Sequence, residues 1–114
     1  MDFAERAARN EEVFRGVNER IEAGVEQHGV HAPVPYHCEC ASASCFELIE
    51  MRPADYERIM RERYRFIVIP GHEDPTIEQI VETHDDHFVV EKVGEAREQL
   101  DRDHPQQRHA ASDG

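Results

Sequence analysis

The feature that most constrains this chain is a ten-residue block, 36–45, that contains all three of its cysteines and a histidine. The block reads Tyr-His-Cys-Glu-Cys-Ala-Ser-Ala-Ser-Cys. Three thiols cannot all pair with one another as disulfides, which disfavours a disulfide framework. Reduced thiols gathered in so short a segment favour a metal site that stabilises a small domain. The cysteines are Cys38, Cys40 and Cys45.

Zinc geometry sets conditions on this block. Zinc takes four ligands at the corners of a tetrahedron, so two thiolates on one ion lie just under about 4 Å apart. On an ideal strand the β-carbons of Cys38 and Cys40 would be about 6–7 Å apart. The chain must therefore bend at Glu39 for both sulfurs to reach one ion. The small residues between Cys40 and Cys45 permit the chain to return to the same point.

A fourth ligand has to come from a histidine. We predict His72, because it follows the turn Pro70-Gly71 directly after a strong strand that would present it rigidly. His37 is the alternative, but its side chain would point away from that of Cys38 on an extended segment. Further candidates are His84 and His87. The predicted ligands of a single zinc ion are Cys38, Cys40, Cys45 and His72.

Other uses of the cysteines are open alternatives. An iron–sulfur cluster is disfavoured because it takes four cysteine ligands and the chain has three. Reduced cysteines also pack as small hydrophobic residues. Redox or nucleophilic use of a thiol is the third alternative, although no orienting residue or oxyanion hole is apparent beside His37.

A long amphipathic helix is predicted near the start of the chain, from Asn10 to about Gln27. Asn10 would cap its first turn, although helical character extends back toward Phe3, and Gly29 marks its end. We expect the apolar face of this helix to cover a sheet; a helix–helix seam between two copies is the alternative. That face consists of Phe14, Val17, Ile21 and Val25.

Three later segments predict the strands of a small, mainly antiparallel sheet. They combine β-branched and aromatic residues with apolar alternation. The turn Pro70-Gly71 ends the second of these strands, and the turn Asp85-Asp86 precedes the third. An extended connector, 30–36, leads into the cysteine block. The strand segments are 46–51, 65–69 and 87–93.

Prolines mark the starts of two short helices. Pro53 occupies the first helical position of a helix at 54–61. Pro75 opens a second helix, and a further helix runs from Gly94 to Leu100. The apolar residues of the helix after Pro75 are Ile77, Ile80 and Val81.

These elements predict a zinc-stabilised α+β fold with a long N-terminal helix, a sheet of about three strands and two short helices. A chain of 114 residues has the size of one domain, and its core is small. We place that domain at residues 1–100. Residues 101–114 are polar, without an apolar pattern, and are predicted to form a disordered tail.

The net charge of −12 argues against a general nucleic-acid binder, because a polyanion is repelled unless basic residues are segregated. Some arginines do gather between Arg52 and Arg65, and we interpret them as a solvated helix face. No apolar run reaches membrane-spanning length, and the first residues are charged rather than typical of a signal peptide. We therefore expect a cytoplasmic protein with reduced thiols and no membrane contact.

The same residues favour a non-catalytic role. A catalytic zinc needs an open coordination position, whereas three cysteines and a histidine close the shell. Glu39, Glu73 and Asp74 adjoin the candidate ligands, and in so acidic a chain we expect solvated loop residues rather than a catalytic base. The prediction is a regulatory or protein-interaction module, in transcription or stress response. The alternative is a metal-dependent enzyme, or a thiol sensor that uses Cys38 or Cys40.

Five segments of the chain resemble those of a group of small, uncharacterised actinobacterial proteins: residues 10–21, His37-Cys38-Glu39-Cys40 with Cys45, 56–59, 65–73 and 88–92. The similarity covers roughly residues 10–93. Members of the group often carry Leu-Thr before the middle helix, where this chain has Met51-Arg52 and lacks the threonine cap. The resemblance implies a shared fold, with the four predicted ligands in matching positions, and brings no activity with it.

Overall fold

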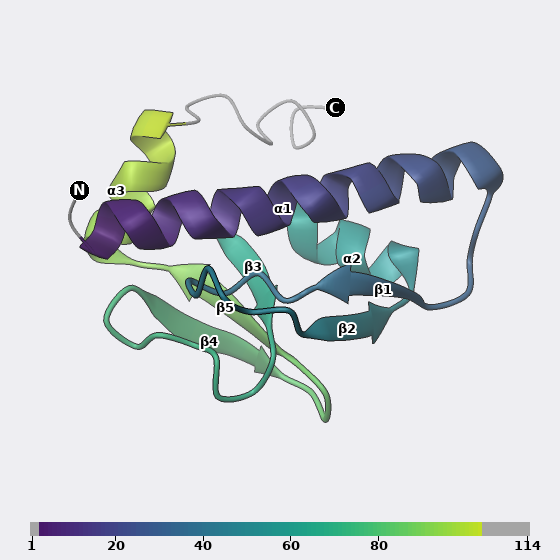
Figure 1. Cartoon of the computed structure of the whole chain (residues 1–114). Helices are drawn as coiled ribbons and strands as arrows, with labels where there is room; N and C mark the ends of the chain where they lie inside the picture. Colours follow the sequence, from purple (N-terminus) through teal and green to yellow (C-terminus); the bar gives the residue numbers. More distant parts are fainter. Residues whose placement is uncertain (1–2, 104–114) are drawn as a thin grey trace.

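The computed structural model describes residues 3–103 of the chain and has three helices and two antiparallel sheets (Figure 1). The α+β class predicted from the sequence is therefore confirmed. The predicted tail begins inside the last helix, and residues 104–114 lie outside the described part. The helices are α1 (Phe3–His28), α2 (Pro53–Met60) and α3 (Gly94–Asp103). The strands are β1 (Val34–His37), β2 (Leu48–Met51), β3 (Arg65–Val68), β4 (Glu78–Thr83) and β5 (Phe88–Lys92).

Helix α1 begins earlier than Asn10 and ends at the predicted glycine. Gly29 has φ 65°, and the Val30 N–H donates to the Val25 carbonyl at 3.1 Å, which makes a Schellman C-cap. Asn10 does not cap the helix, because it lies inside it; its side-chain amide instead donates to the Ala41 carbonyl at 2.7 Å. This contact ties the helix to the loop between the cysteines.

The two sheets have the strand orders β1-β2 and β3-β5-β4. The connector before the cysteines contains β1, which pairs with β2 so that Tyr36 lies opposite Ile49. In the larger sheet β5 is central, and Phe66 of β3 lies opposite Val90. Helix α1 runs along one side of the molecule, across both sheets (Figure 1).

The prediction of a helix after Pro75 is wrong. Residues 78–83 form strand β4, which pairs with β5. Its register shifts between Ile80 and Glu82, so Val81 is an extra residue in a β-bulge. The bulge breaks the strict alternation of a strand and leaves Ile77, Ile80 and Val81 at a spacing that imitates a helix. The β-branched side chains favour the strand.

Helix α2 begins at Pro53, as predicted, and has no side-chain cap. Arg52 precedes it in an extended conformation (φ −69°, ψ 141°). Tyr56 of this helix stacks on Tyr36 of β1 with ring centroids 4.3 Å apart. The main core joins this pair to the inner faces of the strands and includes Phe14, Ile49, Ile59, Phe66, Ile67, Val68, Val89 and Val90.

The inward face of α1 is more polar than the sequence suggested. Phe14 and Val25 are buried as predicted, but Val17 is 37% exposed. Three side chains that sequence patterning would place in water are buried on this helix: Glu11, Arg15 and Asn18. Each of them has a partner in the strands or in the cysteine block, which is why burial is tolerated.

Glu11 belongs to a buried cluster of three charged residues. The Lys92 ammonium of β5 contacts the carboxylates of Glu11 and Glu78, and all three side chains are buried. One cation does not neutralise two carboxylates. Burial raises the pKa of Glu11 to about 8, although Lys92 opposes this shift. Glu11 therefore holds a proton in the folded protein at pH values where the unfolded chain has released it.

This proton predicts an unusual pH dependence. The folded-state pKa of Glu11 exceeds its ordinary value of 4.5, so the contribution of Glu11 to the free energy of unfolding should fall as pH rises from about 5 to about 8. Urea unfolding with excess zinc, at pH values of about 6 and 8.5, measures the slope. Glu11→Gln should flatten it, and Glu98→Gln, an exposed position on α3, should not. An equal slope in Glu11→Gln would contradict the assignment.

Candidate metal centre

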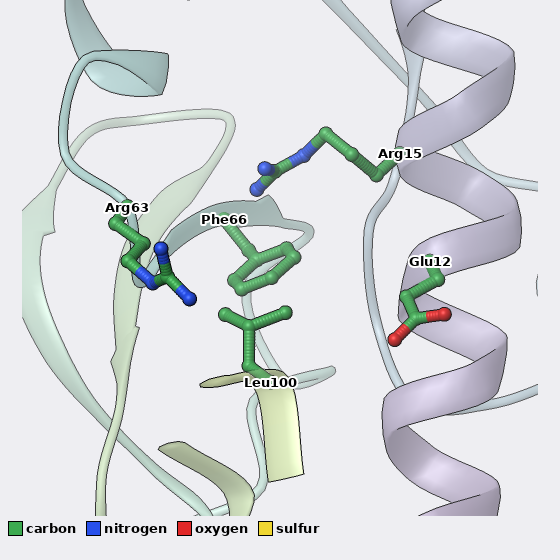
Figure 2. A pocket seen from close by; sticks show the side chains of 5 residues that line it. All are labelled: Glu12, Arg15, Arg63, Phe66 and Leu100. Atoms are coloured by element: carbon green, nitrogen blue, oxygen red, sulfur yellow. The ribbon is translucent and has the colours of Figure 1, made fainter. Parts of the chain in front are cut away.

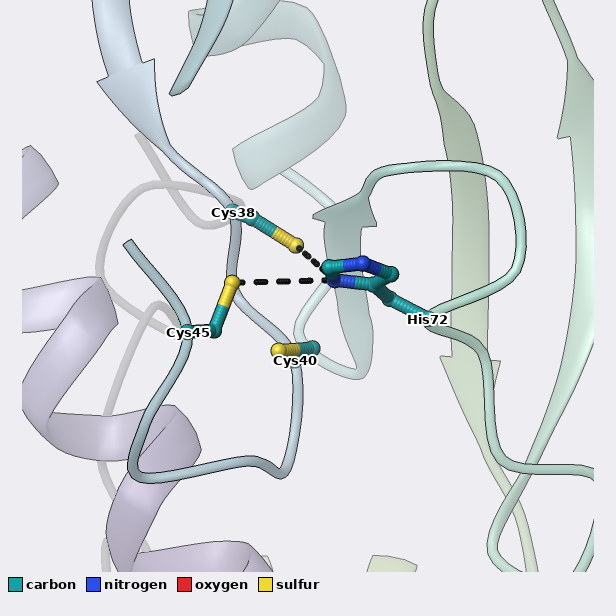
Figure 3. Close-up of side chains that lie close together, drawn as sticks. All are labelled: Cys38, Cys40, Cys45 and His72. Atoms are coloured by element: carbon teal, nitrogen blue, oxygen red, sulfur yellow. Dashed lines mark hydrogen bonds between the residues drawn. The ribbon is translucent and has the colours of Figure 1, made fainter. Parts of the chain in front are cut away.

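The cysteine block leaves the end of β1 and returns to the start of β2, while His72 follows β3. Figure 3 shows the four predicted ligands facing a common point. One ligand atom from each of the four lies within 4.8 Å of the others, and no disulfide joins the thiols. The fold thus brings together the residues predicted from spacing: Cys38, Cys40, Cys45 and His72.

The distances fit a tetrahedral site. With bond lengths typical of zinc, a sulfur and a nitrogen on one tetrahedral ion lie about 3.6 Å apart. His72 Nδ1 lies 3.6 Å from Cys38 Sγ and 3.6 Å from Cys45 Sγ. The cysteines are buried, whereas His72 is partly exposed at the rim. The two sulfur–nitrogen distances, together with a fourth ligand atom from Cys40 within 4.8 Å of the others, are consistent with a metal site.

A tight turn positions His72. The His72 N–H donates to the Ile69 carbonyl at 2.9 Å, which closes a four-residue turn after β3. Pro70 occupies its second position and Gly71, with φ 97°, its third, as a type II turn requires. The Ile69 N–H also donates to Cys38 Sγ at 3.2 Å. The turn therefore supplies one candidate ligand and hydrogen-bonds another.

The thiols influence one another electrostatically. The Cys38 thiol donates a hydrogen bond to Cys40, which lowers the pKa of Cys40 to about 5 and raises that of Cys38. Burial raises the pKa of Cys45. Metal ligation requires thiolates, so a cation that binds here must displace protons from Cys38 and Cys45. Its affinity should consequently increase with pH.

His37, the alternative fourth ligand, lies behind the cluster. Its ring nitrogens face the backbone carbonyls of two candidate ligands, Nδ1 at 2.5 Å from Cys38 O and Nε2 at 3.1 Å from Cys45 O. The ring stacks on Phe14 of α1 with centroids 4.0 Å apart. Both ring nitrogens thus face carbonyl oxygens of the loop rather than the thiols, which leaves the ligand position to His72.

The remaining predicted histidines lie elsewhere. His84 and His87 stack on each other at the turn between β4 and β5, with centroids 4.4 Å apart. His84 contacts Glu82 at 3.0 Å, and His87 contacts Asp86 at 2.7 Å. Neither is part of the cysteine cluster.

The acidic residues next to the ligands are engaged in local structure. Glu73 accepts a hydrogen bond from the Gly71 N–H at 2.8 Å. Asp74 accepts from the Thr76 N–H at 3.0 Å and from the Thr76 hydroxyl at 2.6 Å. These contacts give both carboxylates a role in shaping the loops around His72.

Glu39 has a role that the sequence did not reveal. Its side chain is fully buried, and its carboxylate receives Arg15 Nε at 2.9 Å and Arg15 Nη2 at 3.2 Å. Tyr56 Oη donates at 2.7 Å, Asn18 Nδ2 at 3.0 Å and the Ile67 N–H at 3.0 Å. Five donors from α1, α2 and β3 thus saturate the carboxylate, which cannot also act as a base at the thiols.

Arg15 completes this arrangement. Its guanidinium also donates to the Arg65 carbonyl and lies over the Phe66 ring, 3.9 Å from the centroid. Figure 2 shows it at the top of a narrow crevice that Glu12, Arg63 and Leu100 also line. The spacing of Arg15 and Asn18, one helical turn apart beside Phe14, was the only sequence signal for a polar buried face.

Comparison of the chain with protein-family models, with curated proteins and with solved structures returned no match. None of the helices in residues 3–103 combines the length and the apolar composition needed to cross a lipid bilayer.

Proposed function

We propose that the chain is a non-catalytic zinc-binding module that acts by binding a protein partner. The observation that carries the proposal is the donor set: the thiols of three buried cysteines and a His72 nitrogen lie within 4.8 Å of one another, and His72 Nδ1 lies 3.6 Å from both Cys38 Sγ and Cys45 Sγ. Thiolate-rich sets favour zinc over magnesium or calcium, which prefer oxygen ligands. Four protein ligands fill the tetrahedron, as in structural rather than catalytic zinc sites.

The ion would link parts of the chain that are distant in sequence. It would hold the loop between β1 and β2 against the turn after β3. Strands β1 and β2, which flank this loop, have four residues each. The two-stranded sheet that they form would be only marginally stable alone. Metal-binding free energy is folding free energy in domains of this kind.

Two observations support a binding role. Glu39, which lies between Cys38 and Cys40 in the sequence, is committed to Arg15 and Tyr56, so its carboxylate is not free to act as a base at the thiols. Two large apolar side chains that follow Cys45 in the chain, Phe46 and Leu48, are exposed, and Phe46 lines the same hollow as Cys40 and Cys45. Exposed apolar side chains beside a rigid centre are typical of interaction surfaces. We place the role in regulation, in transcription or stress response.

A thiol sensor that uses Cys38 or Cys40 is the second candidate. A surface hollow lined by Cys40, Cys45 and His72 favours Cys40 in this role, because it gives a small oxidant a path toward that thiol. Fewer observations support a metal-dependent enzyme, because the four proposed ligands leave no open coordination position on the ion.

Metal analysis of the natively purified protein tests the proposal. We expect one zinc per chain, and thiols that react with a maleimide only after a chelator has removed the ion. His72→Ala should reduce the zinc content, whereas His84→Ala, which changes a histidine outside the cluster, should not. Thiols that react while zinc is bound would favour the sensor. Absence of zinc would contradict the proposal of a zinc-binding module.

A further inference from the structure

Strand β2 pairs with β1 along one edge, and within residues 3–103 the backbone groups on its other edge have no strand beside them. The Cys38 N–H donates to the Glu47 carbonyl at 2.9 Å, so these residues form a hydrogen-bonded pair at the end of the β1-β2 ladder. Antiparallel ladders alternate hydrogen-bonded and non-bonded pairs. Leu48 and Glu50 therefore occupy non-bonded positions, and their N–H and C=O groups point away from β1. No partner for them occurs in the described residues.

The opposite edge of this sheet is closed. Pro35, which lies opposite Glu50, has no N–H to offer. The Asn18 side chain of α1 covers His37: its Oδ1 accepts from the His37 N–H at 2.6 Å, and its Nδ2 donates to the His37 carbonyl at 2.8 Å. The fold protects one edge with a proline and an asparagine. Of the usual devices that prevent strand addition, the β2 edge carries no proline, lysine or bulge.

Side chains along β2 are suited to a strand laid beside it. Phe46, Leu48 and Glu50 alternate in sequence and point to one face, while Ile49 and Met51 are buried on the other. Phe46 is 84% exposed and Leu48 is 56% exposed. A strand added at this edge would place its residues opposite two apolar side chains and one carboxylate.

A hollow lies at each end of this edge. One is lined by Phe46, Glu47 and His72, next to the proposed metal centre. The other is lined by Glu50, Arg52 and the two histidines of the β4–β5 turn. Peptides that bind by strand addition take their affinity from main-chain hydrogen bonds and their specificity from hollows for alternate side chains. The β2 edge offers both.

The charge of the β2 edge indicates which kind of chain would bind there. Glu47 and Glu50 are exposed on this edge, and the chain has a net charge of −12. A second copy would bring the same acidic edge and the same net charge, which opposes self-pairing. We propose that β2 binds an extended segment of a protein partner as an added antiparallel strand, with an apolar residue opposite Leu48 and basic residues opposite Glu50 and Phe46, since a cation packs favourably on an exposed aromatic ring as well as beside a carboxylate. This inference rests on the proposed function and names the kind of partner.

A defined peptide tests the inference on zinc-loaded protein. The probe is Thr-Lys-Thr-Val-Thr-Lys-Thr with blocked ends, which presents lysine, valine and lysine on one face. We expect it to slow hydrogen exchange of the Leu48 and Glu50 amides about tenfold or more at saturation. A probe N-methylated at its lysines and valine, which cannot complete the ladder, should bind at least about tenfold more weakly. A probe with glutamate in place of lysine should also fail to bind.

Two charge-reversed variants complete the experiment. Glu50→Lys should weaken binding of the lysine probe about tenfold or more. Glu98→Lys makes the same charge change on the exposed surface of α3 and should leave it nearly unchanged. Both variants should retain their zinc. Loss of peptide binding at the β2 edge can therefore be distinguished from loss of the metal centre.

Three outcomes would overturn the inference. The first is no binding by zinc-loaded protein. The second is binding that leaves the Leu48 and Glu50 amides unprotected, which would indicate charge attraction alone. The third is protection of these amides in the free protein that increases with protein concentration, which would identify a second copy as the occupant.

Discussion

Cys45→Ser is expected to lose zinc and most of its stability. Serine preserves the size of the side chain but supplies no thiolate, so the proposed ion would retain three protein ligands. Structural zinc contributes about 10–16 kcal/mol in small zinc domains, comparable with the whole stability of a domain this size. We expect a loss of at least about 4 kcal/mol, or roughly 15 °C in melting temperature. Thermal unfolding monitored by circular dichroism, with metal analysis of the same sample, measures both.

Ser44→Ala is the matched control for this loss. Ser44 lies in the same loop, is exposed, and makes one side-chain contact, with Ser42 at 3.0 Å. Its removal should leave zinc content unchanged and shift the melting temperature by a few degrees at most, about what surface substitutions do. Unchanged zinc and stability in Cys45→Ser would mean that the cysteines pack as ordinary core residues.

Glu39→Gln should destabilise the protein strongly although it replaces no proposed metal ligand. A glutamine presents an amide to donors that now face a carboxylate, and it leaves the buried Arg15 guanidinium without its counter-charge. Breaking a buried pair by removing one partner costs about 3–5 kcal/mol. Urea unfolding in excess zinc measures this loss. Zinc content should stay near one ion per chain while the variant is folded, because the Glu39 carboxylate is bonded to α1, α2 and β3 and not to the thiols.

The exposed pair of Arg58 and Glu82 provides the comparison. Arg58 Nη1 lies 3.2 Å from Glu82 Oε2, and both side chains are partly exposed. Arg58 lowers the pKa of Glu82 to about 2, yet solvent screening limits what such a pair contributes. Glu82→Gln should cost less than about 1 kcal/mol. Similar losses in Glu39→Gln and Glu82→Gln would contradict the role assigned to the buried carboxylate.

Coupling between Arg15 and Glu39 can be measured separately. If the two act as a pair, Arg15→Leu combined with Glu39→Leu should destabilise the protein less than the sum of the single changes, by about 0.5–3 kcal/mol. Additive losses would indicate that the other donors to Glu39, among them Tyr56 and Asn18, dominate.

Much of the candidate site was predictable because its chemistry is local in the sequence. The three thiols lie within eight residues, and His72 follows a turn whose Pro-Gly pair restricts its geometry. Tetrahedral geometry then required a fourth ligand from outside the block. Strands β3 and β5 and the start of α2 were predicted for similar reasons, since apolar alternation and a first-turn proline act over a few residues.

The errors have a common physical origin in tertiary contacts. The segment after Pro75 is a strand because β5 pairs with it, and its bulge hid the alternation. Asn10 is held by a carbonyl thirty-one residues away rather than by its own helix. Val17 is exposed because the neighbouring Arg15 and Asn18 occupy the inward face.

Residue type and spacing were enough to predict a histidine ligand from outside the cysteine block and a chain of helices and short antiparallel strands. The choice between the histidines depends on contacts between distant segments, because His72 and His37 differ in where their nitrogens point. Such contacts also determine the role of Glu39. In the sequence, Glu39 is an acidic residue between two cysteines, as any loop residue could be. Its five hydrogen-bond donors come from α1, α2 and β3, so the local sequence around Glu39 does not indicate them.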